Sequence, residues 1–566
     1  MSTTEVKKSI SNLLMIGPLL VSIFLLSATH TDPVNVTKLF ILGGVGMGAL
    51  SIFVTRGIQT AWQAFKMPLL VVFGFEILLV ANLFTSNAPF TQNFYGVYGR
   101  NNGVLTYLLF SFILLAALLL TQRESFKKVV YSFLATGLIN IVYCLWVLSF
   151  GDFIGWDNPY KSILGLLGNP DFISALLGMF IAGSLSLILS NEFPVNFRVF
   201  FAIAGALAFY EIMKSHAIQG LVVSVGSIGL VALFKIRARF ESKFVLVTFV
   251  VISAIIGLFA VLGTLQRGPL DFLYKRSVSL RGSYWHAGLS MGWKNPFTGV
   301  GLDTYGDWYR RTRPPVALID TPGINTVSNV AHNVVIDFFA SGGFPLLISY
   351  VAILLLGAGA ILRFIIRNKA YDPIFVSIAS IWTCYQVQSF ISINQIGLAI
   401  WGWVFTGLLL GYEMSSRTKN NFDISAPNRD QIKKNLGSGN PISSNLIVGI
   451  GISIGLLVAA PPFLADSKWF LALNSRSVTN VEDALSSSLF NPSDSAKYFQ
   501  AVNVFQTSNL PDQARKYALK AVKYNPDYFD AWKILFHLPN TTKLEKLDAL
   551  KNMKRLDPNN PDVSAP

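Results

Sequence analysis

Residues 343–366 read GFPLLISYVAILLLGAGAILRFII and contain a single charged side chain, Arg363. A helix needs about 20 apolar residues to cross the hydrocarbon layer of a membrane, so this run is long enough to span it. Runs of similar length recur over the first 464 residues and predict about 13 transmembrane helices. Their approximate spans are 10–29, 37–55, 67–85, 104–121, 129–149, 171–190, 198–213, 217–235, 244–264, 343–366, 373–393, 397–414 and 445–464. The predicted fold class is therefore all-α, a polytopic membrane protein.

The composition agrees with this class. Of 566 residues, 52% are hydrophobic and 13% are charged, whereas a soluble protein carries about 25% charged residues. The net charge of +15 would suit a nucleic-acid partner, but Lys and Arg form short clusters between apolar runs instead of lining one face. Both cysteines, Cys144 and Cys384, lie inside apolar runs. We therefore expect no nucleic-acid partner, no metal site and no cofactor.

The basic clusters also predict the orientation, because short cytoplasmic loops retain Lys and Arg. With the N-terminus inside, the inner loops and the segment after the twelfth span hold most of the cations: Lys7, Lys8, Arg56, Lys66, Arg123, Lys127, Lys128, Arg198, Lys235, Arg237, Arg239, Lys243, Arg363, Arg367, Lys369, Arg417, Lys419, Arg429, Lys433 and Lys434. The outer short loops hold only Lys38, Arg100, Lys161 and Lys214. This topology predicts a large outer loop at 265–342 and an external C-terminal tail.

The chain after the membrane domain (1–414) divides into three parts. Residues 415–444 are polar and rich in Asn, Ser and Gly, which is typical of a flexible cytoplasmic linker. A last transmembrane helix at 445–464 would carry 465–566 across the membrane. In that tail, Asn-Pro or Asp-Pro pairs begin at 491, 525 and 557, intervals of 34 and 32 residues, close to the period of tetratricopeptide repeats. We predict a small extracytoplasmic domain of such helical repeats, with an unrelated set of helical hairpins as the alternative.

The outer loop carries the strongest motifs. It contains Arg281, residues 295–301 (NPFTGVG), and His332-Asn333 ahead of a glycine pair at 342–343. Two shorter pieces, YGVYGRNNG at 95–103 and GLLGNP at 165–170, also lie on the predicted outer side. In this order, the motifs resemble the O-antigen ligase and O-antigen polymerase superfamily, and the resemblance extends over about residues 10–414.

The resemblance implies a metal-independent glycosyltransferase with a helical membrane fold of the C type in the bacterial cytoplasmic membrane. Such enzymes pass a glycan from an undecaprenyl diphosphate carrier to a hydroxyl acceptor on lipid, glycan or protein, in envelope polysaccharide biosynthesis or protein O-glycosylation. Membrane lipids would surround it. A concave surface of helical repeats would also suit a protein acceptor or another envelope protein. The alternatives are a transporter or flippase of lipid-linked sugars, and a scaffold that uses its spans as an anchor.

The diphosphate of such a donor needs cations, and guanidinium groups bind its oxygens in forked pairs. Arg281 is our first candidate, and Arg276 and Arg100 are helpers; each could instead anchor a loop at lipid headgroups. Where the family usually has Ser-Arg, this chain has Ser215-His216. His216, with Lys214 beside it, is therefore a further candidate, although the change puts the diphosphate geometry in doubt.

His332 is the candidate general base. Ser328 and Asn329 are good N-cap residues, so we expect His332 in the first turn of a helix, where the helix dipole favours the neutral imidazole. Such a ring could accept a proton from the acceptor hydroxyl, or it could serve only to hold the loop in place.

Other notable side chains have structural explanations. Glu211 can pair with Lys214 one turn away on the same helix. Glu76, also within a span, is either a protonated structural carboxyl or a group lining a cavity. The aromatic residues of the outer loop suit an interfacial belt or sugar stacking: Trp285, Trp293, Trp308 and Tyr309.

Overall fold

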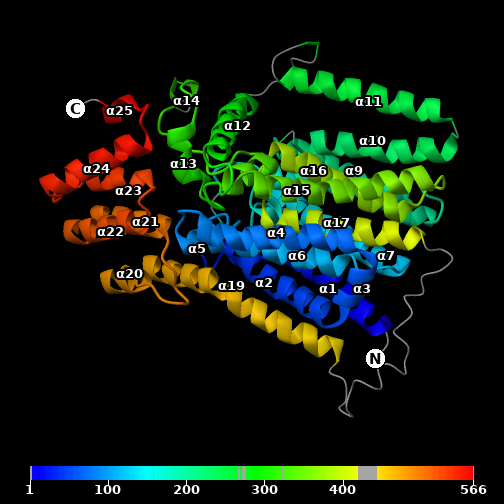
Figure 1. Cartoon of the computed structure of the whole chain (residues 1–566), viewed down its shortest axis with the longest axis horizontal. Helices are drawn as coiled ribbons and strands as arrows, with labels where there is room; N and C mark the ends of the chain where they lie inside the picture. Colours follow the sequence, from blue (N-terminus) through cyan, green and yellow to red (C-terminus); the bar gives the residue numbers. More distant parts are fainter. Residues whose placement is uncertain are drawn as a thin grey trace.

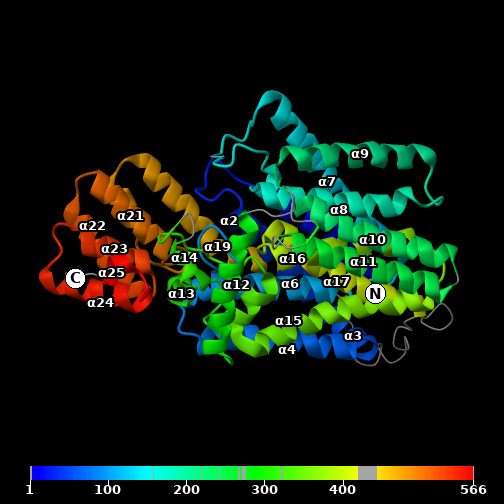
Figure 2. The same ribbon diagram turned by 90° about the horizontal axis from the view of Figure 1, so that it is seen from above.

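The computed structural model describes residues 3–156, 158–217, 219–240, 242–264, 268–269, 276–319, 323–417 and 443–564. Its architecture is a bundle of long helices with a smaller group of helices beyond one end (Figures 1 and 2). The bundle helices are α1 (Thr3–Ile23), α2 (Asn35–Ile52), α4 (Lys66–Thr85), α6 (Val104–Ala117), α7 (Arg123–Phe150), α8 (Pro170–Ile188), α9 (Val195–Lys214), α10 (Gln219–Arg239), α11 (Lys243–Thr264), α15 (Val334–Arg367), α16 (Pro373–Ile391), α17 (Ile396–Arg417) and α19 (Ser444–Ser475). A π-helical turn, η1 (Phe53–Gly57), and α3 (Ile58–Ala64) continue α2.

The helices coincide with the predicted spans. Eleven of the described helices are long and apolar enough to cross a membrane. The predicted spans at 104–121 and 244–264 correspond to shorter apolar helices, at Val104–Ala117 and Val247–Phe259. The prediction of an all-helical, polytopic membrane protein is confirmed.

Short helices lie between the long ones and in the tail. Those between bundle helices are α5 (Phe90–Tyr95), the 3-10 turn η2 (Gly165–Leu167), α12 (Arg276–Lys294), α13 (Tyr305–Thr312) and α14 (Val316–Ile319). The tail consists of α20 (Val478–Ala484), α21 (Ser495–Thr507), α22 (Pro511–Tyr524), α23 (Phe529–His537), α24 (Lys543–Leu556) and α25 (Pro561–Ser564). In Figure 1, α12–α14 lie at the same end of the bundle as the tail, and we call this the tail end; the N-terminus lies near the opposite end.

Helix α17 forms the centre of the bundle. All of its span is buried, and the largest of its side chains, Trp401, is fully enclosed. The indole of Trp401 donates a hydrogen bond to the hydroxyl of Ser22 at 2.8 Å, and that hydroxyl in turn donates to the carbonyl of Gly397 at 2.6 Å. Pairing of this kind is required because a buried polar group without a partner costs several kcal/mol in hydrocarbon.

Lys38 shows that a buried charged group is also paired within the protein. Its side chain is fully buried near the start of α2, although the distribution of Lys and Arg predicted it in an outer loop. Its ammonium donates to the carbonyls of Val21, Ser22 and Phe24, at 3.1, 2.7 and 3.2 Å. These carbonyls lie at the C-terminal end of α1, where no helical N–H remains to pair with them. Lys38 therefore caps α1 and does not contribute to the orientation signal.

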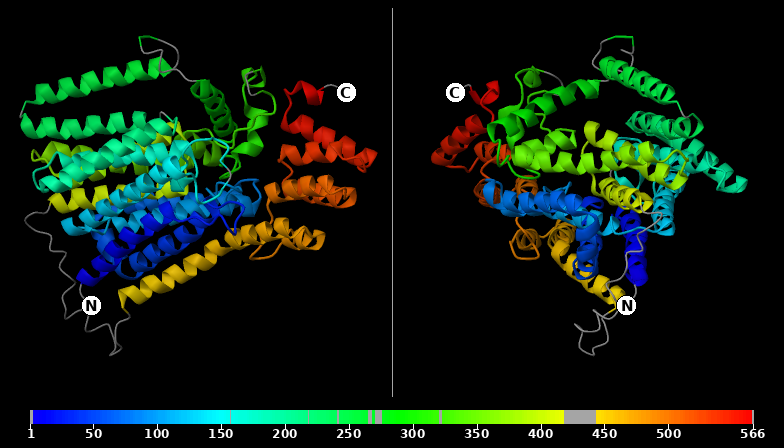
Figure 3. Two further views of the ribbon diagram at one scale, coloured as in Figure 1. Left: turned by 180° about the vertical axis from the view of Figure 1, so that it is seen from behind. Right: turned by 45° about the vertical axis from the view of Figure 1, so that its right-hand side comes forward.

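Helix α19 packs closely on α2 and carries the chain into the tail (Figure 3). A Cβ at Gly455 would lie 1.9 Å from the carbonyl oxygen of Gly43, and one at Gly451 would lie 2.6 Å from that of Met47. Gly451, Gly455 and Ala459 are four residues apart, so they form one stripe of small residues that lets the two backbones approach. Helix α19 extends to Ser475, beyond the predicted end of the span at 464.

The tail consists of paired helices, α21 with α22 and α23 with α24. Ala514, Ala518 and Ala521 are buried in it, as their small size and helical spacing predicted. The tetratricopeptide assignment itself stays a prediction. Most of the predicted linker, 418–442, lies outside the described residues.

Three arginines hold the tail against the bundle: Arg310 and Arg311 of α13, and Arg313 directly after this helix. Arg313, which is 1% exposed, donates to both carboxylate oxygens of Asp557 at 2.9 and 2.8 Å. Arg310 pairs with Asp530 at 3.2 Å. Arg311 pairs with Asp527 at 3.2 Å. Removing one partner of a buried ion pair costs about 3–5 kcal/mol, because the other charge is left buried without compensation. These pairs therefore fix how the tail docks against the bundle.

The contact between α2 and α19 can be tested by one methyl group. We expect Gly455→Ala to destabilise the folded chain by about 1–3 kcal/mol, because the new Cβ overlaps a backbone carbonyl that a side-chain rotation cannot move. Gly449→Ala on the same helix is the matched control, since nothing lies within 4 Å of a Cβ there. Thermal unfolding of both full-length variants in detergent measures the difference. Equal midpoints would contradict the packing described here.

Candidate functional site

A break in α15 and the NPFTGVG segment form the base of the site. Helix geometry is interrupted at Gly343, where φ is 63°, and a Cβ there would lie 2.2 Å from the carbonyl oxygen of Pro296. Val300 N–H donates to the carbonyl of Ala340 at 2.9 Å, and Phe344 N–H donates to that of Pro296 at 2.8 Å. The glycines of the motif are therefore needed for close contact between two backbones.

A second loop, residues 96–103, is held by a carboxylate from the same region. The Oδ2 atom of Asp303 accepts hydrogen bonds from Val97 N–H at 2.7 Å and from Asn102 N–H at 3.2 Å. Gly96 adopts φ 90°, and a Cβ there would lie 2.4 Å from the backbone nitrogen of Asn102. Burial raises the pKa of Asp303, while the guanidinium of Arg100 and the two N–H donors act in the opposite direction. Asp303 thus positions the loop that carries Arg100.

His332 lies just before α15 and not in its first turn, so the expectation drawn from Ser328 and Asn329 is wrong. The N-cap is Asn333, whose side chain accepts from Val335 N–H and Ile336 N–H at 3.0 and 3.2 Å. His332 itself adopts a left-handed φ of 55°. This conformation turns its ring against the ring of Tyr284, with centroids 5.4 Å apart.

Arg281, Arg100 and His332 converge. Arg281 lies one turn before Tyr284 on α12. Asp171 and the Tyr284 hydroxyl interact favourably with its positive charge. Burial and, to a smaller extent, the charges of Arg100 and Arg281 lower the pKa of His332 to about 3. The Nδ1 atom of His332 is buried and has no hydrogen-bond partner among the described residues. The site therefore contains a neutral imidazole within electrostatic range of two guanidinium groups.

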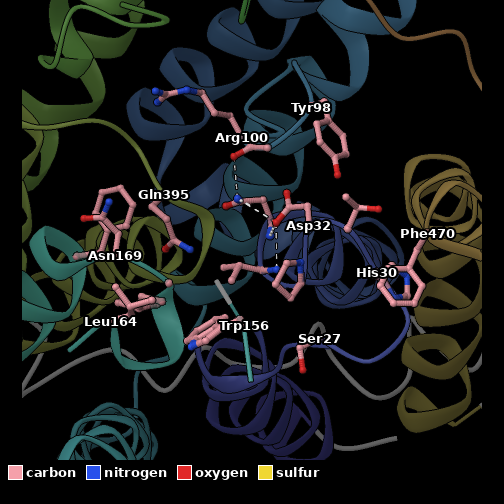
Figure 4. Close-up of a pocket in the computed structure, with 18 of the residues that line it drawn as sticks. Ser27, His30, Asp32, Tyr98, Arg100, Trp156, Leu164, Asn169, Gln395 and Phe470 are labelled. Atoms are coloured by element: carbon pink, nitrogen blue, oxygen red, sulfur yellow. Dashed lines mark hydrogen bonds between the residues drawn. The ribbon is translucent and has the colours of Figure 1, made fainter. Parts of the chain in front are cut away.

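A cavity of about 760 Å³ is lined by Arg100 and by Asn329, three residues before His332, whereas Arg281 and His332 are not among its lining residues. Its volume is that of a small-molecule site. Figure 4 shows Arg100 and Tyr98 on one side of it, with Asn169 and Gln395 on another and Phe470 on a third. The wall is polar over most of the positions labelled there. Asn169 is also the N-cap of α8, where its side chain accepts from Asp171 N–H at 2.8 Å. Both short motifs of the sequence, 95–103 and 165–170, thus contribute to one cavity.

The structure separates two of the other predicted cations, His216 and Lys214, from this centre. His216 is exposed after the end of α9, with φ 57°, and it does not line the cavity. Lys214 is also exposed and lies 5.5 Å from the centre of the Tyr210 ring. Arg276 begins α12, one and a half turns before Arg281. Of the predicted diphosphate ligands whose side chains the structure describes, Arg281 and Arg100 are the two that act electrostatically on His332.

The predicted pairing of Glu211 with Lys214 is wrong. Both carboxylate oxygens of Glu211 are buried and have no hydrogen-bond partner among the described residues. Glu76, by contrast, accepts a hydrogen bond from the hydroxyl of Ser111 at 2.7 Å. Among the loop aromatics, Trp293 is exposed, whereas Tyr309 is buried against its neighbours in the outer loop.

Sequence reasoning missed a polar group at the mouth of the cavity, between α1 and α2. His30 is 4% exposed, its Nε2 has no partner among the described residues, and its ring lies 4.3 Å from that of Phe463 on α19. The carboxylate of Asp32 accepts a hydrogen bond from Val34 N–H at 3.1 Å, and the backbone N–H of Asp32 donates to the carboxylate of Asp466 at 3.0 Å. A His and an Asp in a short loop between two spans were the available signal, but neither belongs to a motif.

These features define a polytopic helical membrane protein with a cationic, imidazole-containing site at one end of its bundle. A family model described as O-Antigen ligase matches residues 200–351. That segment includes Arg281, the NPFTGVG segment and His332, so the match confirms the resemblance at its strongest motifs. The match supports the O-antigen ligase and polymerase superfamily for this part of the chain. A search of curated proteins finds no match to it.

The protonation of His332 can be measured without an activity assay. Because its pKa is lowered to about 3, the ring should stay neutral as the pH falls from 8 to 5. We expect one of the five ¹³Cε1-histidine NMR signals, identified by its loss in His332→Gln, to keep its neutral shift over this range. A midpoint near 6.5 for that signal, the ordinary value for histidine, would show that the ring is not enclosed as described.

Proposed function

We propose that the protein transfers a glycan from an undecaprenyl-diphosphate-linked donor to a hydroxyl acceptor at the outer face of the bacterial cytoplasmic membrane. The O-antigen ligase domain supports glycan transfer in general. The observation that carries the finer proposal is that Arg281 and Arg100 both act electrostatically on a neutral His332, and that Arg100 also lines a large polar cavity.

In the proposed reaction, the acceptor oxygen forms a bond to the anomeric carbon of the donor sugar. The bond from that carbon to the phosphate oxygen breaks, and its electron pair leaves with the diphosphate. Arg281 and Arg100 stabilise the growing negative charge, which is the usual role of fixed cations at a departing phosphate. His332 takes the hydroxyl proton of the acceptor, which requires a neutral ring. The negative charge of the bound diphosphate, which offsets the two guanidinium groups, would raise the basicity of that ring. Arg276, His216 and Lys214 would act at most as outlying attractors for the anionic donor.

The sidedness of this proposal rests on the loop charges. Ion pairs such as Arg123 with Glu192, and Arg367 with Glu413, each at 2.8 Å, lie in the loops that the charge pattern assigns to the cytoplasm. Since Lys38 is a helix cap, the opposite loops hold even fewer free cations than the sequence count suggested. The tail end of the bundle, with the candidate site, would then be extracytoplasmic.

The catalytic assignment is tested by complementing a gene deletion and analysing envelope polysaccharide and glycoprotein on gels. We expect Arg281→Ala to lower transfer about 10²- to 10³-fold and His332→Ala about 10²- to 10⁴-fold. Arg281→Lys should recover part of the loss, because it keeps the charge but not the fork. Leu289→Ala on the exposed face of α12 is the matched control. Wild-type banding by both Ala variants, at equal membrane abundance, would refute the assignment.

The orientation is tested with single cysteines and a membrane-impermeant maleimide in spheroplasts. Ile319→Cys and Leu544→Cys, at highly exposed positions of the tail end, should be labelled without lysis. Gln122→Cys, in an exposed loop at the opposite end, should be labelled only after lysis. The native cysteines are both buried and should give little background. The reverse pattern would place the site in the cytoplasm. Accumulated lipid-linked glycan that an external probe reaches would argue against a flippase.

A further inference from the structure

A second cavity lies where the tail meets the bundle. Its volume is about 310 Å³, at the lower end of the range of ligand sites. The bundle side contributes Tyr98 and Asp307, and the tail contributes Ala496, Tyr528 and Asp530. Neither part of the chain forms this cavity alone, and the catalytic groups of the proposed function do not line it.

This cavity adjoins the larger one beside the candidate site. Tyr98 and Asn329 line both of them, so the two spaces share a wall. Asn329 also lines a small cavity of about 30 Å³ that reaches Asp337 and Tyr305, and it lies three residues before His332. Asn329 thus links the walls of all three cavities to the segment that carries His332.

The walls of the tail cavity are set in advance by hydrogen bonds. The side chain of Asn525 donates to Asp307 at 3.0 Å, and that of Gln92 donates to the same carboxylate oxygen at 3.0 Å. Arg310 lies 4.3 Å from the centre of the Phe529 ring while it pairs with Asp530. Burial raises the pKa of Asp307 to about 6, although the two amide donors lower it. A preformed site of this kind loses less entropy when a ligand binds.

The lining suits a neutral, hydroxylated ligand. Tyr98 and Tyr528 offer partly exposed rings, on which the apolar faces of sugar rings can stack. Asn329, Asp307 and Asp530 offer planar amide and carboxylate groups, which accept hydrogen bonds from hydroxyls. The one cation of the lining, Arg310, is already paired with carboxylates, so the site lacks an uncompensated positive charge for a polyanion.

We propose that the tail is an acceptor-binding element: the cavity between α13, α21 and α23 holds sugar units of a neutral glycan acceptor while its reacting hydroxyl reaches His332. This inference rests on the proposed function and adds the class of acceptor and the role of the tail. Binding energy from the non-reacting part of a substrate can position its reacting group. The buried pairs of Arg313 with Asp557 would keep the two walls of the cavity in register.

The test fills the cavity from the tail side. Ala496→Trp places a large ring in the lining, while Asn503→Trp places the same ring on the exposed face of α21 as the matched control. Full-length proteins are reconstituted with lipid-linked glycan extracted from the deletion strain. The acceptor is the lipid-free neutral glycan cut from the envelope of the host. Transfer is measured against acceptor concentration, and release of glycan from the donor to water is measured with no acceptor present.

We expect Ala496→Trp to lower kcat/KM for the acceptor at least tenfold and to leave donor hydrolysis within twofold of wild type. Tyr528→Leu, which removes a ring without filling space, should raise KM for the acceptor about fivefold or more and serves if the first variant does not fold. Equal kinetics for Ala496→Trp and Asn503→Trp would overturn the proposal. So would a defect of Ala496→Trp that appears only with host envelope protein as acceptor, because the cavity would then serve a polypeptide.

Failure of the proposed function has a different signature. In that case wild-type protein transfers no glycan to any acceptor, and Arg281→Ala leaves donor hydrolysis unchanged. If the function holds and only the role of the tail is wrong, wild-type protein transfers glycan, Arg281→Ala abolishes transfer and hydrolysis together, and the two Trp variants are indistinguishable.

Discussion

The structure depends on one constraint: backbone that leaves helical geometry near hydrocarbon must find its hydrogen bonds within the protein. Three such segments meet at the tail end, namely 96–103, 295–303 and the break in α15 at Gly343. They satisfy one another, through bonds such as Val300 N–H to the carbonyl of Ala340 and through the carboxylate of Asp303. Glycine is needed where these backbones touch. The candidate site is therefore built from the part of the bundle where regular helices end.

The same constraint applies to buried charged side chains, which must also find partners within the protein. Lys38 is stabilised by three carbonyls at the end of α1, and Arg313 by a buried carboxylate of the tail. Arg281 and Arg100 differ, because their nearest opposite charges are also engaged in capping or in holding loops: Asp171 sits in the first turn of α8 and Asp303 binds backbone N–H groups. An anionic ligand would complete the pairing of these two guanidinium groups. That arrangement suits a site that binds and releases a diphosphate.

The C-terminal tail also supplies partners for buried polar groups of the bundle. Its repeat-position residues, Asn525 and Asp557, do not face solvent but contact the bundle, Asn525 at Asp307 and Asp557 at Arg313. The interval of 32 residues between these two positions therefore also spaces their contacts with residues 307 and 313, whereas Asn491 bonds to carbonyls within the tail. Because the docking uses buried ion pairs, the tail is held as part of the site region and is not a separate domain on a tether. The close contact of α19 with α2 directs it there.

Much of the fold was readable from the chain. Spans such as 343–366 are evident because apolar length is a direct requirement of the bilayer, and the glycines of 295–301 and 342–343 marked the site because few other contexts need them so closely spaced. Local rules failed where a competing contact was decisive. Asn333 and not Ser328 caps α15, since only its side chain reaches the free N–H groups of that helix. Lys214 stacks near Tyr210 and leaves Glu211 without it.

The sequence by itself thus determined the class of protein, the positions of its spans and the motifs that line its site, because those follow from hydropathy and backbone conformation along a single segment. Only the tertiary structure decided which cations meet. Arg281 and Arg100, 181 residues apart in the chain, both act on His332, whereas His216 faces away from the cavity. The same holds for the cavity between tail and bundle, whose walls come from segments about 400 residues apart. Such distances are set by helix packing, and no local pattern in the chain encodes them.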